Sequence, residues 1–393
     1  MWRIYNIIYK EQWQSLFLLH QIEFFLNFYL LMKIKNKIIN LFTKEKIRIN
    51  QKLEKIQFNV IKKVIAIILC VLCYKFATYI KFKKTSVYIM DLNKKFSLKN
   101  TNPKSNNIKV ALCTMGKKEN LYVSEFVGYH LKIGIDHIFI YDDNDPKEER
   151  MSDAIPIEYK NKTTVIENIK KMNLNNQPDT FTHCYQNNIN KFNWFVMIDM
   201  DEFVYIVNGT IKDYLSNNKF NKCDFIRLHW VSTNDNGLVH YDNRSLFERF
   251  KPPYFIDTSI KTVVKGNIPK LKYWVHSPDF SPGRNISCIN TGDLFNGHYH
   301  NEGCRKINIE KSFIIHFRYK STEEFIAKYK RGMSNWFGNR KNEVSVLNRK
   351  LDEYFEQNEI TLEKLDYVER ELNISLLYYR IKYYVLKFSI LFY

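Results

Sequence analysis

The sequence has no glycine-rich phosphate loop, and this absence excludes two common classes of nucleotide-binding protein. Only 12 of the 393 residues are glycine. The segment after the first expected strand reads Thr-Met-Gly-Lys at residues 114–117, which fits neither a Walker A sequence nor a dinucleotide-binding fingerprint. A nucleotide bound by this chain would therefore have to be held through acidic side chains and a metal ion.

Cysteine and histidine patterns typical of zinc sites are also missing. Cys70 and Cys73 form a C-x-x-C, but they lie inside an apolar run and have no second pair, so we interpret them as packing or lipid-facing residues. His298 and His300 resemble a metal-binding pair but have no third ligand nearby in the sequence. The sequence therefore does not predict a zinc site.

Most of the chain lacks an excess of basic residues, although its net charge is +19. Residues 1–107 hold 20 Lys and Arg against 5 Asp and Glu, and so carry +15 of that charge. Residues 108–393 carry only +4. This distribution is typical of charge that flanks a membrane segment, so we expect no nucleic-acid partner.

A long uninterrupted apolar run is absent as well. The best candidate, residues 64–80, has 17 residues interrupted by Lys75, which is near the lower limit of about 17 for crossing a bilayer. We interpret residues 61–84 as a transmembrane signal anchor, with a core or interfacial helix as the alternative. Residues 1–60 are then a basic amphipathic segment, in which membrane entry by residues 13–32 and a start at Met32 stay open. Residues 85–107 are polar and predict a stem.

From residue 108 the sequence alternates between strand and helix patterns. The expected strands are 108–113, 137–141, 163–166 and 196–198, and the expected helices between them are 119–133 and 180–191. Such alternation predicts a doubly wound parallel sheet, in which ligands bind beyond the carboxyl ends of the strands. Residues 246–300 are expected to form an irregular, substrate-binding surface. A strand at 313–319 and a helix from 322 follow, with one or two further helices in 344–393.

Acidic side chains gather at two of the expected strand ends. Asp199, Asp201 and Glu202 follow one apolar strand, and Asp142 and Asp143 follow another. Buried carboxylates without partners are costly, and an Asp-x-Asp at a strand end can place two oxygen ligands on Mg²⁺ or Mn²⁺ together with a diphosphate. The alternative for either cluster is a solvated acidic turn.

Short motifs follow one another between residues 108 and 335. Glu125, Tyr129 and His130 fit E-x-x-x-Y-H, and residues 134–144 fit a G-V-D-H-I-Y-I-Y-D-N strand. Residues 194–203 fit W-x-x-x-x-D-x-D-E-F and residues 275–278 fit H-x-P. Residues 315–321 and 331–332 fit N-H-Y-x-x-K-S and R-G, with isoleucine in place of the asparagine. In the order and approximate spacing of these motifs, the chain resembles glycosyltransferase family 92 and related family-2-like GT-A glycosyltransferases.

The resemblance implies a GT-A fold, which is a doubly wound, Rossmann-like mixed sheet, over residues 108–335, with a helical extension at 336–393. It implies a divalent cation, a nucleotide-sugar donor that is UDP-linked, and inverting hexosyl transfer to a glycan or other hydroxyl acceptor. In a eukaryote it implies a single-pass type II protein of the Golgi or endoplasmic reticulum. The alternative is a catalytically inactive GT-A-like membrane protein that binds glycans or acts as a scaffold.

The resemblance also suggests roles for particular residues. The predicted metal ligands are Asp199, Asp201 and His316, because imidazole suits Mn²⁺ better than Mg²⁺. The residues expected to contact the donor nucleotide are Asp142, Asp143, Asn144 and Asp199, with Lys320 and Arg331 at its diphosphate.

Two roles in the expected site and the state of one cysteine pair stay open. Glu202 either anchors the acidic turn or touches the metal, and Glu125 is expected to support structure. No catalytic base is assigned, and its candidates are Asp279, Asp293 and Glu302, with His276 or His298 as alternatives. Cys288 and Cys304 form either a disulfide, if the domain is lumenal, or two buried free thiols.

Overall fold

The computed structural model describes residues 107–251, 254–278, 286–295, 308–331 and 344–390, together with Lys33. The chain divides into two compact units, residues 1–84 and 85–393, and the fold below belongs to the second. The predicted anchor at 61–84 and nearly all of the predicted stem lie outside the described residues. Within the described part, no helix combines the length and apolar character that membrane crossing requires.

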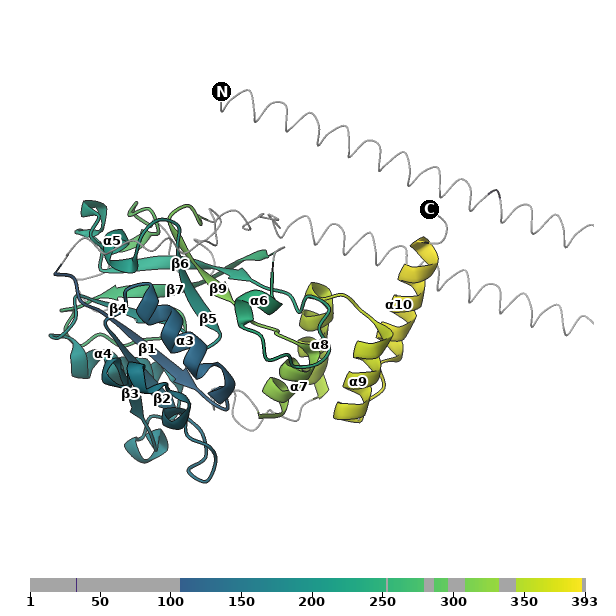
Figure 1. Cartoon of the computed structure of the whole chain (residues 1–393). Helices are drawn as coiled ribbons and strands as arrows, with labels where there is room; N and C mark the ends of the chain where they lie inside the picture. The colour runs from purple at the N-terminus through teal and green to yellow at the C-terminus, as the bar shows by residue number, and fades with distance from the viewer. Residues whose placement is uncertain are drawn as a thin grey trace, which may run out of the picture. The chain divides into compact units, whose positions relative to one another are not determined.

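One nine-stranded mixed sheet forms the centre of the domain (Figure 1). Its strand order is β3-β2-β1-β4-β7-β6-β9-β5, and β8 pairs with β6. The strands are β1 (Val110–Gly116), β2 (His137–Asp142), β3 (Thr163–Ile166), β4 (Trp194–Met197), β5 (Glu202–Ile206), β6 (Phe225–Ser232), β7 (Phe255–Lys265), β8 (Ser287–Ile289) and β9 (Ser312–His316). Strands β1 to β4 are parallel, as the sequence predicts. Strand β7 then runs antiparallel to β4 and β6, and β5 runs antiparallel to β9, so the complete sheet is mixed.

Strand β7 corrects the expectation of an irregular surface at residues 246–300. Its residues Phe255–Lys265 pair with β4 on one side and β6 on the other, in the middle of the sheet. The prediction was wrong here because Lys261 stands where a central strand is normally apolar, and the pattern therefore does not suggest burial. The insertion of β7 places that lysine beside the acidic turn.

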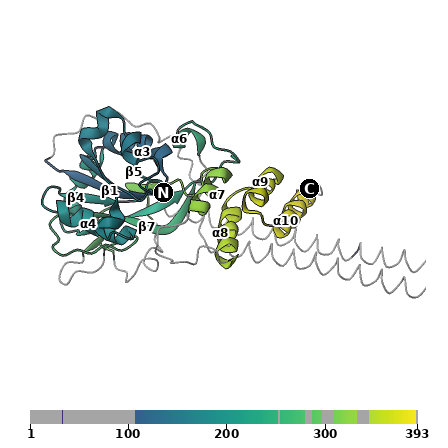
Figure 2. The same cartoon turned by 90° about the horizontal axis from the view of Figure 1, so that it is seen from below.

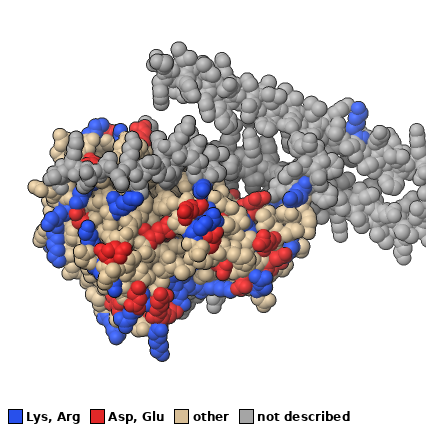
Figure 3. Space-filling model, viewed as in Figure 1, with Lys and Arg blue, Asp and Glu red and all other residues tan. Residues whose placement is uncertain are grey.

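Helices cover both faces of the sheet. Successive strand residues point to opposite faces, so Val110 and Leu112 of β1 pack in one core with α3 (Asn120–Lys132), while Ala111 and Cys113 pack in the other with α4 (Gln177–Asn188). Figure 2 shows these two helices on opposite sides of β1. The described surface seen in Figure 3 carries acidic and basic side chains interspersed rather than separated by sign.

The remaining helices are short connections and a C-terminal group. The short ones are α5 (Ile211–Leu215) and α6 (Leu246–Arg249), with 3-10 turns at Met151–Ala154, Ile157–Lys162, Ile169–Met172 and Asn218–Phe220. The C-terminal group is α7 (Thr322–Arg331), α8 (Val344–Gln357), α9 (Leu362–Leu372) and α10 (Leu377–Ile390), one helix more than expected after residue 344. Buried Asp235, in the loop after β6, fixes this group because it accepts from Tyr354 Oη at 2.6 Å and pairs with Lys364 Nζ at 2.7 Å.

His130 on α3 holds β5 against the helix. Its Nδ1 donates to the Phe126 carbonyl at 2.8 Å, and its Nε2 accepts from the Val204 amide at 3.3 Å. The second bond requires a neutral imidazole, because a protonated Nε2 could not accept. Burial lowers the pKa of His130 to about 3.

We expect His130 to make the fold acid-sensitive. The folded side chain stays neutral, whereas the unfolded one takes up a proton below pH about 6.5, so the free energy of unfolding falls between pH 6.5 and 3, by about 3 kcal/mol at pH 4. His130→Gln offers a donor and an acceptor without a titrating group and should flatten this part of the profile. Urea unfolding between pH 4 and 7.5 measures it, and equal slopes in the two proteins would contradict the assignment.

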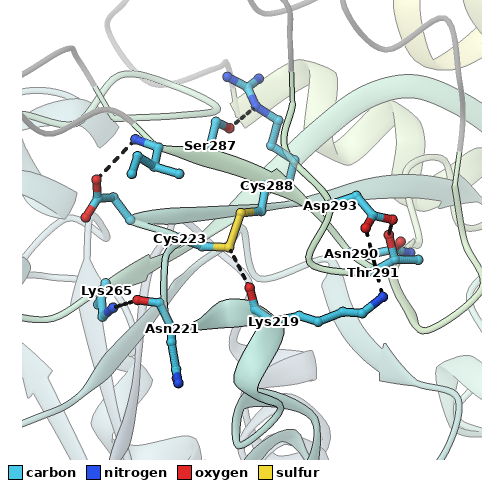
Figure 4. The surroundings of a disulfide bond; sticks show 12 residues. Lys219, Asn221, Cys223, Lys265, Ser287, Cys288, Asn290, Thr291 and Asp293 are labelled. Carbon is cyan, nitrogen blue, oxygen red and sulfur yellow. Dashed lines mark hydrogen bonds and ion pairs between the residues drawn. A yellow bond between two sulfur atoms is a disulfide. The ribbon is translucent and has the colours of Figure 1, made fainter.

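Two disulfides brace the part of the domain that the structure describes. Cys113–Cys184 joins β1 to α4, and Cys223–Cys288 joins the segment before β6 to β8 (Figure 4). Both alternatives for Cys288, a bond to Cys304 and a free thiol, are therefore wrong. The pairing of β8 with β6 brings Cys288 to Cys223 instead, and Cys304 lies outside the described residues.

Removal of the Cys223–Cys288 bond should weaken the domain measurably. The bond closes a loop with a sequence separation of 65 residues, and loss of such a cross-link costs about 2–4 kcal/mol. Cys223→Ser/Cys288→Ser should lower the free energy of unfolding by that amount in oxidising buffer. A double variant as stable as the parent protein under these conditions would show that the bond does not brace the fold.

Candidate functional site

The acidic turn lies between β4 and β5, at the carboxyl edge of the parallel strands. Strand β4 ends at Met197 and β5 begins at Glu202, so Asp199 and Asp201 occupy the connecting turn. This is the edge at which α/β sheets bind ligands. Every carboxylate of the turn faces a basic side chain, and Asp199 and Glu202 face the same one.

Asp199 and Glu202 share Lys261 of β7. The fully buried Lys261 Nζ lies 3.1 Å from Asp199 Oδ1 and 3.8 Å from Glu202 Oε1. Gln177 Nε2, at the start of α4, donates to the same oxygen of Asp199. Glu202 Oε2 accepts from the Asp199 amide at 3.0 Å, and burial raises the pKa of Glu202 well above its usual value. Two roles were left open for Glu202, and this hydrogen bond shows that its side chain anchors the turn.

Asp201 is buried between two basic side chains. Lys328 of α7 contacts one carboxylate oxygen, and His316 Nε2 lies 3.6 Å from the other. Burial by itself would raise the pKa of Asp201, but Lys328 and His316 hold it well below its usual range. Asp201 is therefore ionised, and its position requires a neighbouring positive charge.

Lys320 and Arg331 meet on Glu119, a residue that the sequence reasoning missed. Lys320 Nζ lies 3.0 Å from Glu119 Oε2 and 3.5 Å above the Tyr122 ring, and Arg331 Nη2 lies 2.5 Å from Glu119 Oε1. Glu119 comes between β1 and α3, in the first strand-to-helix turn, which is where α/β sheets commonly bind ligands. The position of Glu119 in this turn is a signal by which the sequence could have identified it as a site residue.

Among the described residues, Glu125, which the motif includes, has backbone partners instead of a lysine or arginine within salt-bridge distance. Its carboxylate accepts from the Leu246 amide at 2.9 and 3.0 Å, at the start of α6. This contact is structural, as expected for Glu125.

The second acidic cluster, at the end of β2, is largely occupied by its own loop. Asp142 accepts from the amides of Asn144 and Met151, both at 2.9 Å. Asn144 Oδ1 accepts from the Lys118 amide at 2.5 Å, while Asp143 pairs with Lys170 at 3.5 Å. A small hollow opens beside this loop, lined by Asp142, Asn144, Asp145, Pro146, Arg150, Glu167 and Asn168. Because β2, β1 and β4 are parallel neighbours, the loop shares an edge with the acidic turn.

The candidates for the catalytic base differ in position. Asp293 lies next to β8, which pairs with the amino-terminal half of β6, so the structure places it at the opposite edge from Asp201. The His276 ring lies 5.3 Å from that of Trp230, which in turn lies 4.4 Å from the His316 ring. The structure thus brings His276 to the site and not Asp293. Asp279, Glu302, His298 and His300 lie outside the described residues.

The acidic turn brings two of the three predicted metal ligands, Asp201 and His316, next to each other. Within the described ranges, no group of three or more His, Cys, Asp and Glu side chains could enclose a metal ion. The carboxylate of Asp201 and the imidazole of His316 lie side by side. The ammonium group of Lys328 contacts the same carboxylate and neutralises its charge. Mg²⁺-type ions commonly bind one or two carboxylates and complete their coordination with substrate phosphates and water. The residues fit such an ion.

Fold and site together define an α/β protein with paired acidic and basic side chains at the ligand-binding edge of its sheet. The family model for glycosyltransferase family 92 matches residues 106–357, and the chain belongs to that family. The match runs through α8, beyond the boundary that the sequence suggested at residue 335.

Curated relatives come from plants. A glycosyltransferase family 92 protein of Ricinus communis is 24% identical over 243 residues, which cover 60% of this chain and 40% of that protein. One from Oryza sativa subsp. japonica is 24% identical over 246 residues, covering 61% of this chain and 38% of that protein. The chain thus spans about two fifths of the length of these relatives.

Proposed function

We propose that this protein is a metal-dependent glycosyltransferase that transfers a hexose from a UDP-linked donor to a hydroxyl group of a glycan. The observation that carries the proposal is the position of the buried, ionised Asp201. It lies beside His316 and close enough to Lys320 for that cation to lower its pKa. The carboxylate of Asp201 would hold a divalent ion, and the basic side chains around it suit the negative charge of a diphosphate.

The roles of the charged residues follow from their contacts. Asp201, His316 and Asp199 would hold Mn²⁺ or Mg²⁺, which stabilises the charge that develops on a leaving diphosphate. Lys320 and Arg331 add positive charge at the same edge, and Glu119 fixes their positions. Lys261 and Gln177 orient Asp199.

We assign the arrangement to the GT-A type, with the donor lying along the carboxyl edge of β1, β2 and β4. The loop of Asp142, Asp143 and Asn144 would then face the uridine or ribose. Inverting transfer needs a base that removes the acceptor proton. His276 is the described candidate that lies near the site.

We further propose a single-pass type II protein of the Golgi or endoplasmic reticulum, anchored by residues 61–84. Its two disulfides support an oxidising compartment, because disulfides are rare in cytosolic proteins.

A donor screen tests the function. The purified chain, with Mn²⁺ and a mixture of glycan acceptors, should release UDP from one or more UDP-sugars, lose this activity with EDTA and regain it when Mn²⁺ is restored. Binding of UDP without release would favour the catalytically inactive, glycan-binding alternative. Absence of both binding and release would contradict the proposal.

A further inference from the structure

Polar side-chain atoms at the carboxyl ends of β6 and β9 are buried and have no hydrogen-bond partner among the residues that the structure describes. They are Trp230 Nε1, Ser232 Oγ, Thr233 Oγ1 and His316 Nδ1. The four residues are between 0% and 8% exposed. Buried polar groups are nearly always hydrogen-bonded, so adjacent unsatisfied groups suggest a partner outside the described part of the chain, such as a bound ligand.

Three of these residues adjoin one another beside Asp201. Ser232 lies opposite His316 in the parallel pair of β6 and β9, and residues opposite each other project to the same face of a sheet. The Trp230 ring lies 4.4 Å from the His316 ring. His316 presents Nε2 to Asp201, which leaves its Nδ1 as the unsatisfied atom.

The chemistry of these atoms suits the hydroxyl groups of a sugar. The indole N–H of Trp230 only donates, the hydroxyl of Ser232 donates and accepts, and His316 Nδ1 does either according to its tautomer. None of the three atoms belongs to a lysine or arginine, as the diphosphate would require. A hydroxyl group both donates and accepts, and the indole offers an apolar face to a sugar ring.

We propose that Trp230, Ser232 and His316 form the subsite for the sugar that the donor transfers. This inference rests on the proposed function, since a diphosphate at Asp201 would bring the attached sugar to His316 and the end of β6. The subsite recognises the hexose ring through its hydroxyl groups, whereas the residues around Asp201 and Glu119 recognise the charged part of the donor.

The test separates affinity for the sugar from affinity for the nucleotide. Ser232→Ala removes one unsatisfied atom with little change in shape, whereas Trp230→Phe also removes one ring, a loss that its matched control repeats. Their matched controls are Trp194→Phe, in the buried amino end of β4, and Ser312→Ala, in the buried amino end of β9. Calorimetry in Mn²⁺ measures the Kd of UDP and of UDP-glucose, UDP-galactose and UDP-N-acetylglucosamine for each protein.

The ratio of the Kd of UDP to that of the best-bound UDP-sugar is the informative quantity. We expect each site variant to lower this ratio by about threefold to tenfold, as loss of one hydrogen bond does, with the Kd of UDP unchanged. The two controls should keep the parent ratio.

Three results would overturn the subsite. They are an unchanged ratio in both site variants, a parallel loss of UDP and UDP-sugar binding, and a parent protein that binds UDP as tightly as every UDP-sugar. A further experiment titrates methyl glycosides into the UDP-loaded protein. If the site variants weaken the binding of methyl glycosides but not that of UDP-sugars, the unsatisfied atoms belong to the acceptor sugar instead. If the parent protein binds no uridine nucleotide at all, the proposed function itself fails.

Discussion

Asp201→Ala should abolish Mn²⁺-dependent release of UDP from the donor, with turnover lowered at least about a hundredfold. The substitution removes the carboxylate that Lys328 and His316 face, which is the proposed ligand of the divalent cation. The domain should stay folded because Lys328 is 38% exposed and can reach water, while burial lowers the pKa of His316 and allows it to become neutral. UDP release at saturating Mn²⁺ measures the loss.

Asp293→Ala is the matched control for this experiment. Asp293 is exposed and lies at the opposite edge of the sheet, so its replacement should leave turnover unchanged. A lower rate in that variant would restore Asp293 as a candidate for the base. Full turnover by Asp201→Ala would contradict the assignment of the site to the acidic turn.

Glu119→Gln should have a large effect on stability. Glu119 is buried, and although burial opposes its ionisation, Lys320 and Arg331 keep its pKa below the usual value. Replacement by glutamine leaves the charge of Lys320 buried without its counter-ion, and loss of one partner of such a pair costs about 3–5 kcal/mol. Urea unfolding at pH 7 measures the change.

Two further variants show whether this cost comes from the unpaired cation. Glu119→Gln/Lys320→Met removes both charges and should recover part of the lost stability. Glu148→Gln removes an exposed carboxylate that pairs with Lys118 and should change stability little. A Glu119→Gln protein as stable as the parent would show that Lys320 and Arg331 are held by other contacts.

The sequence predicted the local elements well in the first half of the domain. Strand β3 occupies the expected residues 163–166, and the helix expected at 119–133 appears as α3 at Asn120–Lys132. Apolar periodicity is a local property, so it is readable without the fold. The rule that ligands lie at the carboxyl ends of strands also placed the two acidic loops at one edge before the sheet was known.

The same reasoning missed features that depend on distant parts of the chain. Strand β7 carries a lysine in the centre of the sheet, which no local pattern predicts as buried. The partner of Cys288 followed from the pairing of β8 with β6, not from proximity in the sequence.

The sequence by itself thus determined where the carboxylates of the candidate site stand, because an apolar strand that ends in Asp-x-Asp-Glu is a local pattern. Only the tertiary structure decided which cations neutralise them. Glu119 and Lys320 are 201 residues apart in the chain, and Asp201 and Lys328 are 127 apart. Ion pairing depends on separation in space and on burial, and the order of strands in the mixed sheet sets both.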